Sequence, residues 1–366
     1  MSSRLRVLAC VLLATHVACA QDVRIGVLGL FHPGQLTLQA VPAQAVVVHV
    51  GTKTFVLERS SGQDTAKITI SGGGLIIRID SQSIRTSSLR ASSRSDDAAD
   101  FVLAVPGKIS RRYRGVLEVR AVAGALAPVV HMDLETAVAS VVQAESVAGT
   151  PLEALKAQAV ASRSYFTAAR RRHHEFDFCD TTHCQFLRAP PPPESDASRA
   201  AKATQGLVLS YRDHAVAAMF TRSCGGRTRT PREVGLSSYG YPYFPVACDY
   251  CQRHPSLWVR RVSPAEAGDL RRGEASRLAL DRRLGWDAVP SNNFTAHSGA
   301  QFVVLEGSGQ GHGIGLCQAG ARAMAQAGAA FREILEHYYP NTVLLNRSVR
   351  SDASAWRETQ HISGSR

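Results

Sequence analysis

The residues with the clearest chemical potential lie between positions 173 and 184, where imidazole and thiol side chains gather. Three histidines and two cysteines fall within twelve residues: His173, His174, Cys179, His183 and Cys184. Thiolate and imidazole are the usual ligands of tetrahedral Zn²⁺. The spacing therefore predicts a zinc site with Cys179, His183 and Cys184 at its core and with His173 or His174 as the fourth ligand.

The cysteines of the chain could form disulfide bonds instead of binding a metal. Six cysteines follow the leader segment described below: Cys179, Cys184, Cys224, Cys248, Cys251 and Cys317. An even number is typical of disulfides in an exported chain. Cys179 could bond to Cys184, and a bond to Cys224 or Cys317 is the other choice. The Cys248-x-x-Cys251 pair could be a disulfide, a redox pair, or half of a second metal site completed by Cys224 and Cys317. No thioredoxin-like pattern surrounds this pair, so a redox role is the least favoured.

Glu145 is the candidate acid. Apolar residues recur at three- and four-residue spacing before it, which predicts a helix with one buried face: Leu134, Val138, Val141 and Val142. Glu145 continues that face. It is either a polar residue at the edge of the core or an acid whose pKa is raised by desolvation.

A second helix is expected directly after Glu145. Thr150 suits the N-cap, Pro151 suits the first turn, and Glu153 suits the third position of a capping box. This helix is expected to end in the basic residues 170–172, beside the negative end of the helix dipole. Because Glu153 has this structural role, Glu145 remains the uncommitted carboxylate.

Glycine alternates with other residues from Gly307 to Gly315. The spacing does not match the G-x-G-x-x-G pattern of dinucleotide-binding proteins. If the run is extended, alternation places Ser308, Gln310 and His312 on one face and bare glycine backbone on the other. Such a surface suits a sugar better than an apolar ligand. The alternative interpretation is a flexible turn segment.

The chain begins with a segment typical of a secretory signal. Residues 1–20 combine Arg4 and Arg6, an apolar run and the sequence Ala18-Cys19-Ala20. No later run reaches the roughly 18 apolar residues that span a bilayer. We therefore expect an exported protein that is periplasmic, cell-wall-associated or secreted. Removal of Arg4 and Arg6 with the signal lowers the net charge from +12 to +10, and the remaining excess favours an anionic wall polymer or membrane surface over nucleic acid, unless it only maintains solubility.

The remaining pattern predicts an α+β protein. After the signal, residues 21–112 carry short β-branched runs and form a β-rich accessory domain. Residues 113–345 mix helices and strands in a body with a substrate groove, and residues 346–366 form a polar tail. Within the body, residues 264–284 are expected to form a charged, solvent-facing helical region.

Five blocks of this sequence resemble the stage II sporulation protein D and amidase-enhancer family (SpoIID/LytB). They occur in the family's order between about Arg114 and Tyr339. The blocks are Val141 to Glu145, Pro151 to Tyr165, His183 to Gln185, Ser223 to Thr228, and Gly311 to Ala321.

The resemblance implies action on the bacterial cell wall. Sporulation members are lytic transglycosylases of glycan strands that lack stem peptides, and Glu145 matches their catalytic acid. Such an acid can protonate the glycosidic oxygen between N-acetylmuramic acid and N-acetylglucosamine. As a base it can then help the muramic 6-hydroxyl close a 1,6-anhydro ring. A single acid suffices for this, unlike hydrolysis by paired carboxylates.

The resemblance also implies partners and a metal. Peptidoglycan glycan strands are the expected ligand, and some members hold zinc near the segment that matches residues 179–184. Other members enhance an amidase. The alternative function is therefore a non-catalytic wall-binding protein that assists an N-acetylmuramoyl-L-alanine amidase. The candidate groove contacts are Gln158, Arg163, His183, Gln185, Ser223, Ser308, Gln310 and His312.

Overall fold

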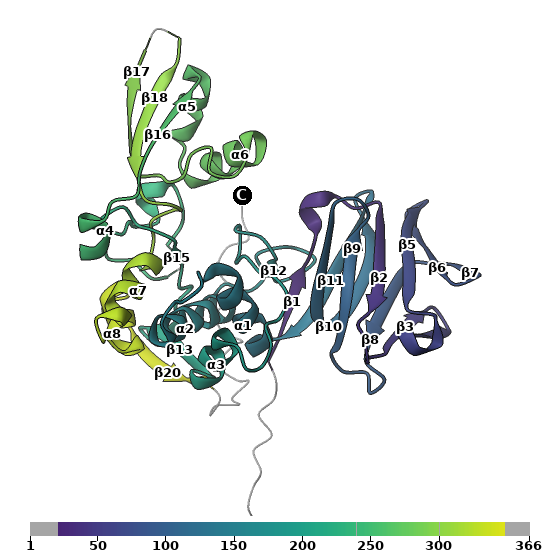
Figure 1. The fold of residues 1–366 in the computed structure, drawn as a ribbon. Helices are drawn as coiled ribbons and strands as arrows, with labels where there is room; N and C mark the ends of the chain where they lie inside the picture. Colours follow the sequence, from purple (N-terminus) through teal and green to yellow (C-terminus); the bar gives the residue numbers. More distant parts are fainter. Residues whose placement is uncertain (1–20, 239, 300, 348–366) are drawn as a thin grey trace, which may run out of the picture.

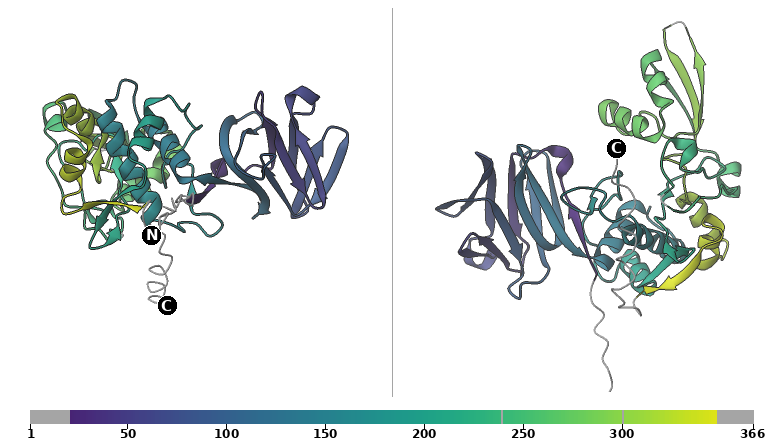
Figure 2. Two further views of the ribbon diagram at one scale, coloured as in Figure 1. Left: turned by 90° about the horizontal axis from the view of Figure 1, so that it is seen from below. Right: turned by 180° about the vertical axis from the view of Figure 1, so that it is seen from behind.

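The computed structural model describes residues 21–238, 240–299 and 301–347. The proposed signal, residues 1–20, and nearly all of the polar tail lie outside these ranges. The described chain is mixed α+β, as predicted. It forms a β-rich part, a helical body and a smaller projecting arm (Figures 1 and 2). None of its described helices is both long and apolar enough to cross a bilayer.

The β-rich part is a curled, mainly antiparallel sheet whose alternating apolar residues face its interior. Its strands follow the order β12-β1-β11-β10-β9-β2-β5-β6-β7, in which β12 is the short later segment Phe178–Cys179, and β3, β4 and β8 branch from it. The bounds are β1 Asp22–Gly26, β2 Gln35–Ala40, β3 Val46–Val50, β4 Lys53–Leu57, β5 Thr65–Ser71, β6 Gly74–Ile79, β7 Gln82–Thr86, β8 Ser88–Ser92, β9 Ala99–Val105, β10 Ile109–Val122 and β11 Ala125–Asp133. Short 3₁₀ turns occupy Gly29–Phe31 and Arg59–Ser61.

Strand β10 lies in the middle of this sheet and connects its two halves. Its first half pairs with β9 and its second half with β11 and β8. Gly115 lies at the change of partner, where an added Cβ would come within 2.3 Å of the His131 carbonyl oxygen. The position therefore requires glycine. Residue 112, where we placed the end of the first domain, falls inside this strand.

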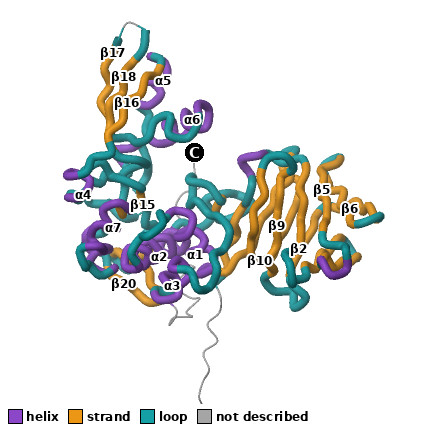
Figure 3. Tube along the Cα trace, viewed as in Figure 1, coloured by secondary structure: helices purple, strands orange, loops and turns teal. Residues whose placement is uncertain are grey.

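The helical body is built around α2 (Leu152–Ala168), which packs against α1, α3, α7, α8 and β13. Figure 3 shows these helices together beside the sheet. The other elements of the body are α1 Leu134–Glu145, β12 Phe178–Cys179, α3 Asp196–Ala203, β13 Leu207–Tyr211, β14 His214–Ala215, β15 Phe220–Thr221, a 3₁₀ turn Arg232–Val234, α4 Asp249–Arg253, β19 Leu316–Cys317, α7 Gln318–Gln326, α8 Phe331–Tyr338 and β20 Val343–Asn346.

The structure differs from our prediction at both ends of α2. The capping-box prediction is wrong, because Pro151 is the N-cap and the Thr150 hydroxyl donates to the Val147 carbonyl. Glu153 instead accepts from the backbone N–H of Phe331, the first residue of α8, at 2.8 Å. The helix also ends at Ala168, before the basic residues, and Arg171 takes a left-handed conformation with φ of 61°.

The arm contains β16 (Leu257–Val262), α5 (Pro264–Leu270), α6 (Glu274–Leu284), β17 (Phe294–Ser298) and β18 (Val303–Ser308). It has its own small core around Trp258 and Leu305. The extended conformation expected for Gly307–Gly315 is wrong, because β18 ends at Ser308. Glycines 309, 311, 313 and 315 all have positive φ, and within the run only isolated β-bridges at Gln310, Gly311 and Ile314 follow β18, so the run bends back to the body instead of continuing as a strand.

Candidate active site

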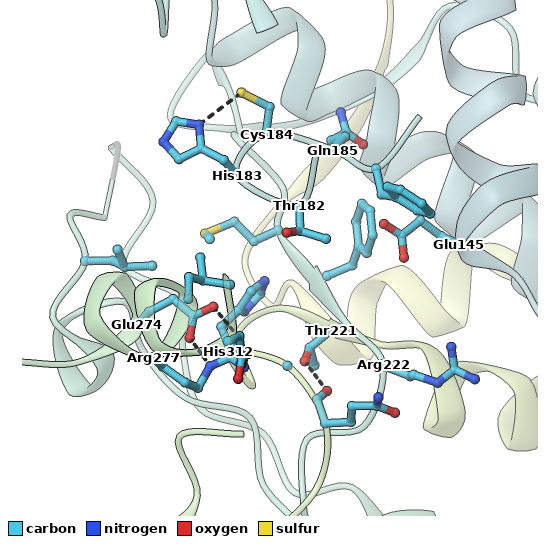
Figure 4. Close-up of a pocket in the computed structure, with 18 of the residues that line it drawn as sticks. Glu145, Thr182, His183, Cys184, Gln185, Thr221, Arg222, Glu274, Arg277 and His312 are labelled. Atoms are coloured by element: carbon cyan, nitrogen blue, oxygen red, sulfur yellow. Dashed lines mark hydrogen bonds and ion pairs between the residues drawn. The ribbon is translucent and has the colours of Figure 1, made fainter. Parts of the chain in front are cut away.

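A cleft of about 350 Å³ lies between the helical body and the arm (Figure 4). This volume is within the range of natural small-molecule sites. Most of its walls come from five parts of the chain that are distant in sequence. They are the end of α1, residues 182–186, residues 218–222, the α6 region and residues 310–312.

Glu145 lies at the C-terminal end of α1 and faces this cleft. Asp133 begins the helix by accepting from the Thr136 N–H, and the apolar face of α1 is buried, as its periodicity predicts. Burial raises the pKa of Glu145 to about 7, although the Phe186 N–H and the charges of Arg222 and Arg188 act in the opposite direction. The negative end of the helix dipole further disfavours a carboxylate here. Glu145 can therefore hold a proton near neutral pH.

The cleft continues past Glu145 into a second hollow of about 140 Å³. Glu145, Arg222 and Gln318 line both spaces. Gln158 lies in the second hollow and is only 3% exposed. Its side-chain nitrogen has no hydrogen-bond partner among the described residues, while its oxygen accepts from Gln318 at 3.4 Å. This amide is thus a free donor beside the candidate acid.

The wall formed by α6 carries a buried ion-pair group. Arg277 donates to both carboxylate oxygens of Glu274 at 2.7 Å and to Asp281 at 2.8 Å. Burial alone would raise the pKa of Glu274, but the Arg277 guanidinium reverses this and lowers it. The prediction of a solvent-facing region is wrong for these three residues, which are buried and line the cleft.

His312 lies across the cleft from Glu145, beside Glu274 and Arg277 (Figure 4). Burial lowers its pKa, although the charge of Glu274 opposes this. The Ile314 backbone N–H donates to Nδ1 at 3.0 Å. The ring is therefore neutral, with its proton on Nε2.

Three of the other predicted groove contacts, Gln185, Gln310 and His183, also line this cleft. Gln185 is buried and bonded to Ser162, accepting from its hydroxyl and donating to its carbonyl. Gln310 donates to Asp287 at 3.0 Å and is only partly buried. His183 and Cys184 complete this side of the cleft.

Ser223 and Ser308 do not line the cleft. Ser223 is buried and exchanges two backbone hydrogen bonds with Gln310. Ser308 accepts from the Asn293 side chain at 2.8 Å, where the arm meets the body. Both residues support the glycine-rich turns from behind.

We predicted that Arg163 contacts substrate. In the structure its side chain is instead 1% exposed and lies outside the cleft. Its guanidinium donates to both oxygens of Glu135, at 2.8 and 2.5 Å. Its remaining donors bond to the carbonyls of Ala201 and Leu207 and to the Thr204 hydroxyl. With these donors occupied, Arg163 joins α1, α2 and α3 and has a structural role.

The predicted metal ligands come together at the rim of the cleft. The ligand atoms of His173, Cys179, His183 and Cys184 all lie within 4.8 Å of one another. The distance from His173 Nε2 to Cys184 Sγ is 3.3 Å, and His183 Nδ1 lies 3.8 and 3.6 Å from the sulfurs of Cys179 and Cys184. A tetrahedral zinc ion with ordinary bond lengths spaces its ligands by about 3.3–3.8 Å. The donor set therefore fits zinc, and His174, which is exposed, stands outside it.

Sequence reasoning missed several cleft residues. Arg222 lies beside Glu145, and the Trp286 indole is 57% exposed in the cleft. An isolated tryptophan carries no periodic signal. The spacing of Glu274, Arg277 and Asp281 at one helical face could have indicated the ion-pair group.

Part of the chain is similar to known proteins. Residues 123–211 match a family model described as Stage II sporulation protein. An uncharacterised protein of Brachyspira hyodysenteriae is 28% identical over 242 residues, which cover 57% of this chain and 65% of the relative. The Amidase enhancer of Bacillus subtilis is 24% identical over 283 residues, covering 56% of this chain and 39% of the relative. The chain thus spans less than two thirds of the length of either relative.

Proposed function

The chain carries a stage II sporulation protein (SpoIID) domain over residues 123–211, and from its cleft we propose that it cleaves peptidoglycan glycan strands as a lytic transglycosylase. Glu145 is the general acid and then the general base. The observation that carries this proposal is the position of Glu145. Its pKa is raised to about 7, and it lies between two connected hollows that can hold sugars on either side of a scissile bond.

In the first step, protonated Glu145 donates to the glycosidic oxygen as the bond from C1 of N-acetylmuramic acid breaks. The carboxylate then accepts the proton of the muramic 6-hydroxyl, whose oxygen bonds to C1 to form a 1,6-anhydro ring. No water is consumed, and Glu145 ends the cycle protonated. This chemistry takes place outside the cytoplasm, in agreement with the proposed signal in residues 1–20.

Other carboxylates of the cleft suit this role less well. Glu274 and Asp281 are both held by Arg277. Asp287 accepts from Gln310. Within the described part of the chain Glu145 forms no ion pair, so its proton is free to transfer. Gln158, Gln310 and His312 offer hydrogen bonds to sugar hydroxyl and acetamido groups.

Zinc fits the cluster of His173, Cys179, His183 and Cys184, which would hold it with no open coordination position. Its contribution there is structural, since a four-ligand site has no place for a reacting water. The segment that it would fix continues directly into Gln185 and Phe186. Phe186 directs its backbone N–H toward Glu145, so the cluster determines where that donor lies.

A second candidate function is non-catalytic. The relative from Bacillus subtilis is named Amidase enhancer, and an open cleft can bind glycan without cutting it. In that case the protein binds the wall and assists an N-acetylmuramoyl-L-alanine amidase.

Mass spectrometry of glycan digests separates the two functions. The mature protein should release 1,6-anhydro fragments from strands stripped of stem peptides and fewer from intact strands. The rate should fall as pH rises through about 7, because the acid loses its proton there. Glu145→Gln should abolish release, whereas the same change at the exposed Glu336 should not. Binding without any product from either substrate would favour the enhancer function.

A further inference from the structure

Four cysteines that the cleft chemistry does not use meet inside the helical body. The sulfurs of Cys224, Cys248, Cys251 and Cys317 all lie within 4.8 Å of one another. All four residues are at most 2% exposed. Within the described ranges every cysteine is a free thiol.

The spacing of the sulfurs matches a metal site better than a disulfide. Cys251 Sγ and Cys317 Sγ are 3.6 Å apart, whereas a disulfide bond is about 2.05 Å long. Four thiolates around zinc at about 2.3 Å are separated from one another by about 3.8 Å. The cluster therefore has the size of a tetrahedral thiolate site.

Hydrogen-bond donors surround these sulfurs. The backbone N–H groups of Cys224 and Gly320 point at Cys317 Sγ, at 3.4 and 3.5 Å. The Ser223 hydroxyl lies 3.4 Å from Cys251 Sγ, and the Tyr338 hydroxyl lies 3.4 Å from Cys248 Sγ. Donors of this kind stabilise the negative charge of metal-bound thiolates.

Gly320 shows that this space is kept for sulfur. An added Cβ at this position would lie 2.6 Å from Cys248 Sγ and 2.0 Å from the Tyr338 hydroxyl oxygen. Any side chain would therefore displace the Tyr338 hydroxyl and the Cys248 thiol from their present positions.

We infer that Cys224, Cys248, Cys251 and Cys317 bind one Zn²⁺ ion in a closed tetrathiolate site, separate from the histidine-containing cluster at the rim of the cleft. All four positions are filled by protein, so the ion is structural. It joins the ends of β15 and β19 to the first turns of α4 and α7.

The location gives this metal a role in shaping the cleft. Arg222 is two residues before Cys224, and Gln318 follows Cys317 directly. Both line the two hollows around Glu145. Loss of the ion should therefore loosen this wall of the cleft. The inference itself does not depend on the proposed glycan cleavage.

The test uses the full-length mature protein with Cys179→Ser and Cys184→Ser, which removes the rim cluster. Elemental analysis should still find about one zinc per chain, and X-ray absorption should find four sulfur ligands at about 2.3 Å. Adding Cys251→Ser should remove that zinc. Because this variant could fail to fold, native alkylation of the unmutated protein provides a second measurement. Cys224, Cys248, Cys251 and Cys317 should resist alkylation until a strong chelator is added.

Three results would overturn the inference. They are an absence of metal in the rim-cluster variant, a coordination shell that contains nitrogen, and disulfide-linked peptides among these four cysteines in the unmutated protein. Glycan cleavage could persist or fail in each case, so the two proposals are judged separately.

Discussion

The side-chain amide of Gln318 donates to the backbone carbonyl of Glu145 at 3.3 Å and thereby joins the start of α7 to the end of α1. The two residues are 173 positions apart in the chain. This bond satisfies one of the free carbonyls at the C-terminus of α1, and it also fixes the position of the candidate acid. The same amide approaches Gln158 Oε1 at 3.4 Å.

Gln318→Ala should therefore lower the turnover of glycan more than it lowers stability. Glu145 loses a positioning contact, while only about 1 kcal/mol of hydrogen bonding is removed. We expect a roughly tenfold fall in kcat with little change in KM. Gln326→Ala, at the exposed end of the same helix, is the matched control. Equal turnover by the two variants would show that Gln318 does not position the acid.

The raised pKa of Glu145 predicts a pH-dependent change in stability. The folded state binds this proton up to about pH 7, whereas the ordinary glutamate value is 4.5. The stability that the bound proton contributes is full below pH 4.5 and is lost as pH rises through 7. Glu145→Gln does not titrate, so relative to the unmutated protein it should gain stability between these values, by at most about 3 kcal/mol at pH 8.

Urea unfolding at pH 4 and pH 8 measures this difference, and Glu153→Gln is the opposite control. The hydrogen bond from Lys156 and the N–H of Phe331 lower the pKa of Glu153. Its contribution is present above the ordinary pKa and is lost as pH falls. Glu153→Gln should therefore be destabilising at pH 8. If both variants changed the free energy of unfolding in the same direction at pH 8, the desolvation of Glu145 would be refuted.

These properties of Glu145 were accessible from sequence because apolar periodicity reports the buried face of a helix directly. The part of the cleft wall that α6 forms could not be predicted from the sequence. Glu274 and Arg277 are buried by pairing with each other, and a hydrophobic pattern does not register such burial. The glycine run was misleading because alternation with glycine does not reveal whether the backbone takes positive φ at each glycine, as it does at residues 309, 311, 313 and 315. The grouping of Cys224 and Cys317 with Cys248 and Cys251 was one of several alternatives left open by the sequence, because the choice depends on the fold, which brings Cys224 and Cys317 together across 93 positions.

Trp286 should bind sugar. Its indole is exposed in the cleft beside Asp287, and an apolar ring face stacks well on the C–H face of a pyranose. Trp286→Ala should raise KM for glycan roughly five- to tenfold, which corresponds to about 1 kcal/mol. Trp286→Phe should recover part of the affinity. Leu284→Ala changes an equally exposed residue that does not line the cleft, and it should leave KM unchanged.

Arg163 should be required for stability. Arg163→Met leaves the Glu135 carboxylate and two carbonyls without their donor, which should cost roughly 3 kcal/mol of unfolding free energy. Arg199→Met breaks an exposed pair with Asp196 and should cost less than about 1 kcal/mol. Chemical denaturation compares the two. A folded Arg163→Met protein of normal stability but weakened glycan binding would restore our original prediction of a substrate contact.

The neighbouring histidines 173 and 174 provide the sharpest test of zinc at the rim of the cleft. His173 Nε2 lies 3.3 Å from Cys184 Sγ, whereas the His174 side chain is 97% exposed and contacts Glu175. His173→Ala should therefore weaken metal retention by roughly 10- to 100-fold or more against a competing chelator, and His174→Ala should not.

Cys179→Ser removes a thiolate ligand and should lower the zinc content by about one equivalent per chain. Elemental analysis after dialysis against the chelator gives both quantities. Equal zinc in Cys179→Ser and in the unmutated protein would exclude the site. Loss of zinc from His174→Ala, but not from His173→Ala, would identify His174 as the fourth ligand in place of His173.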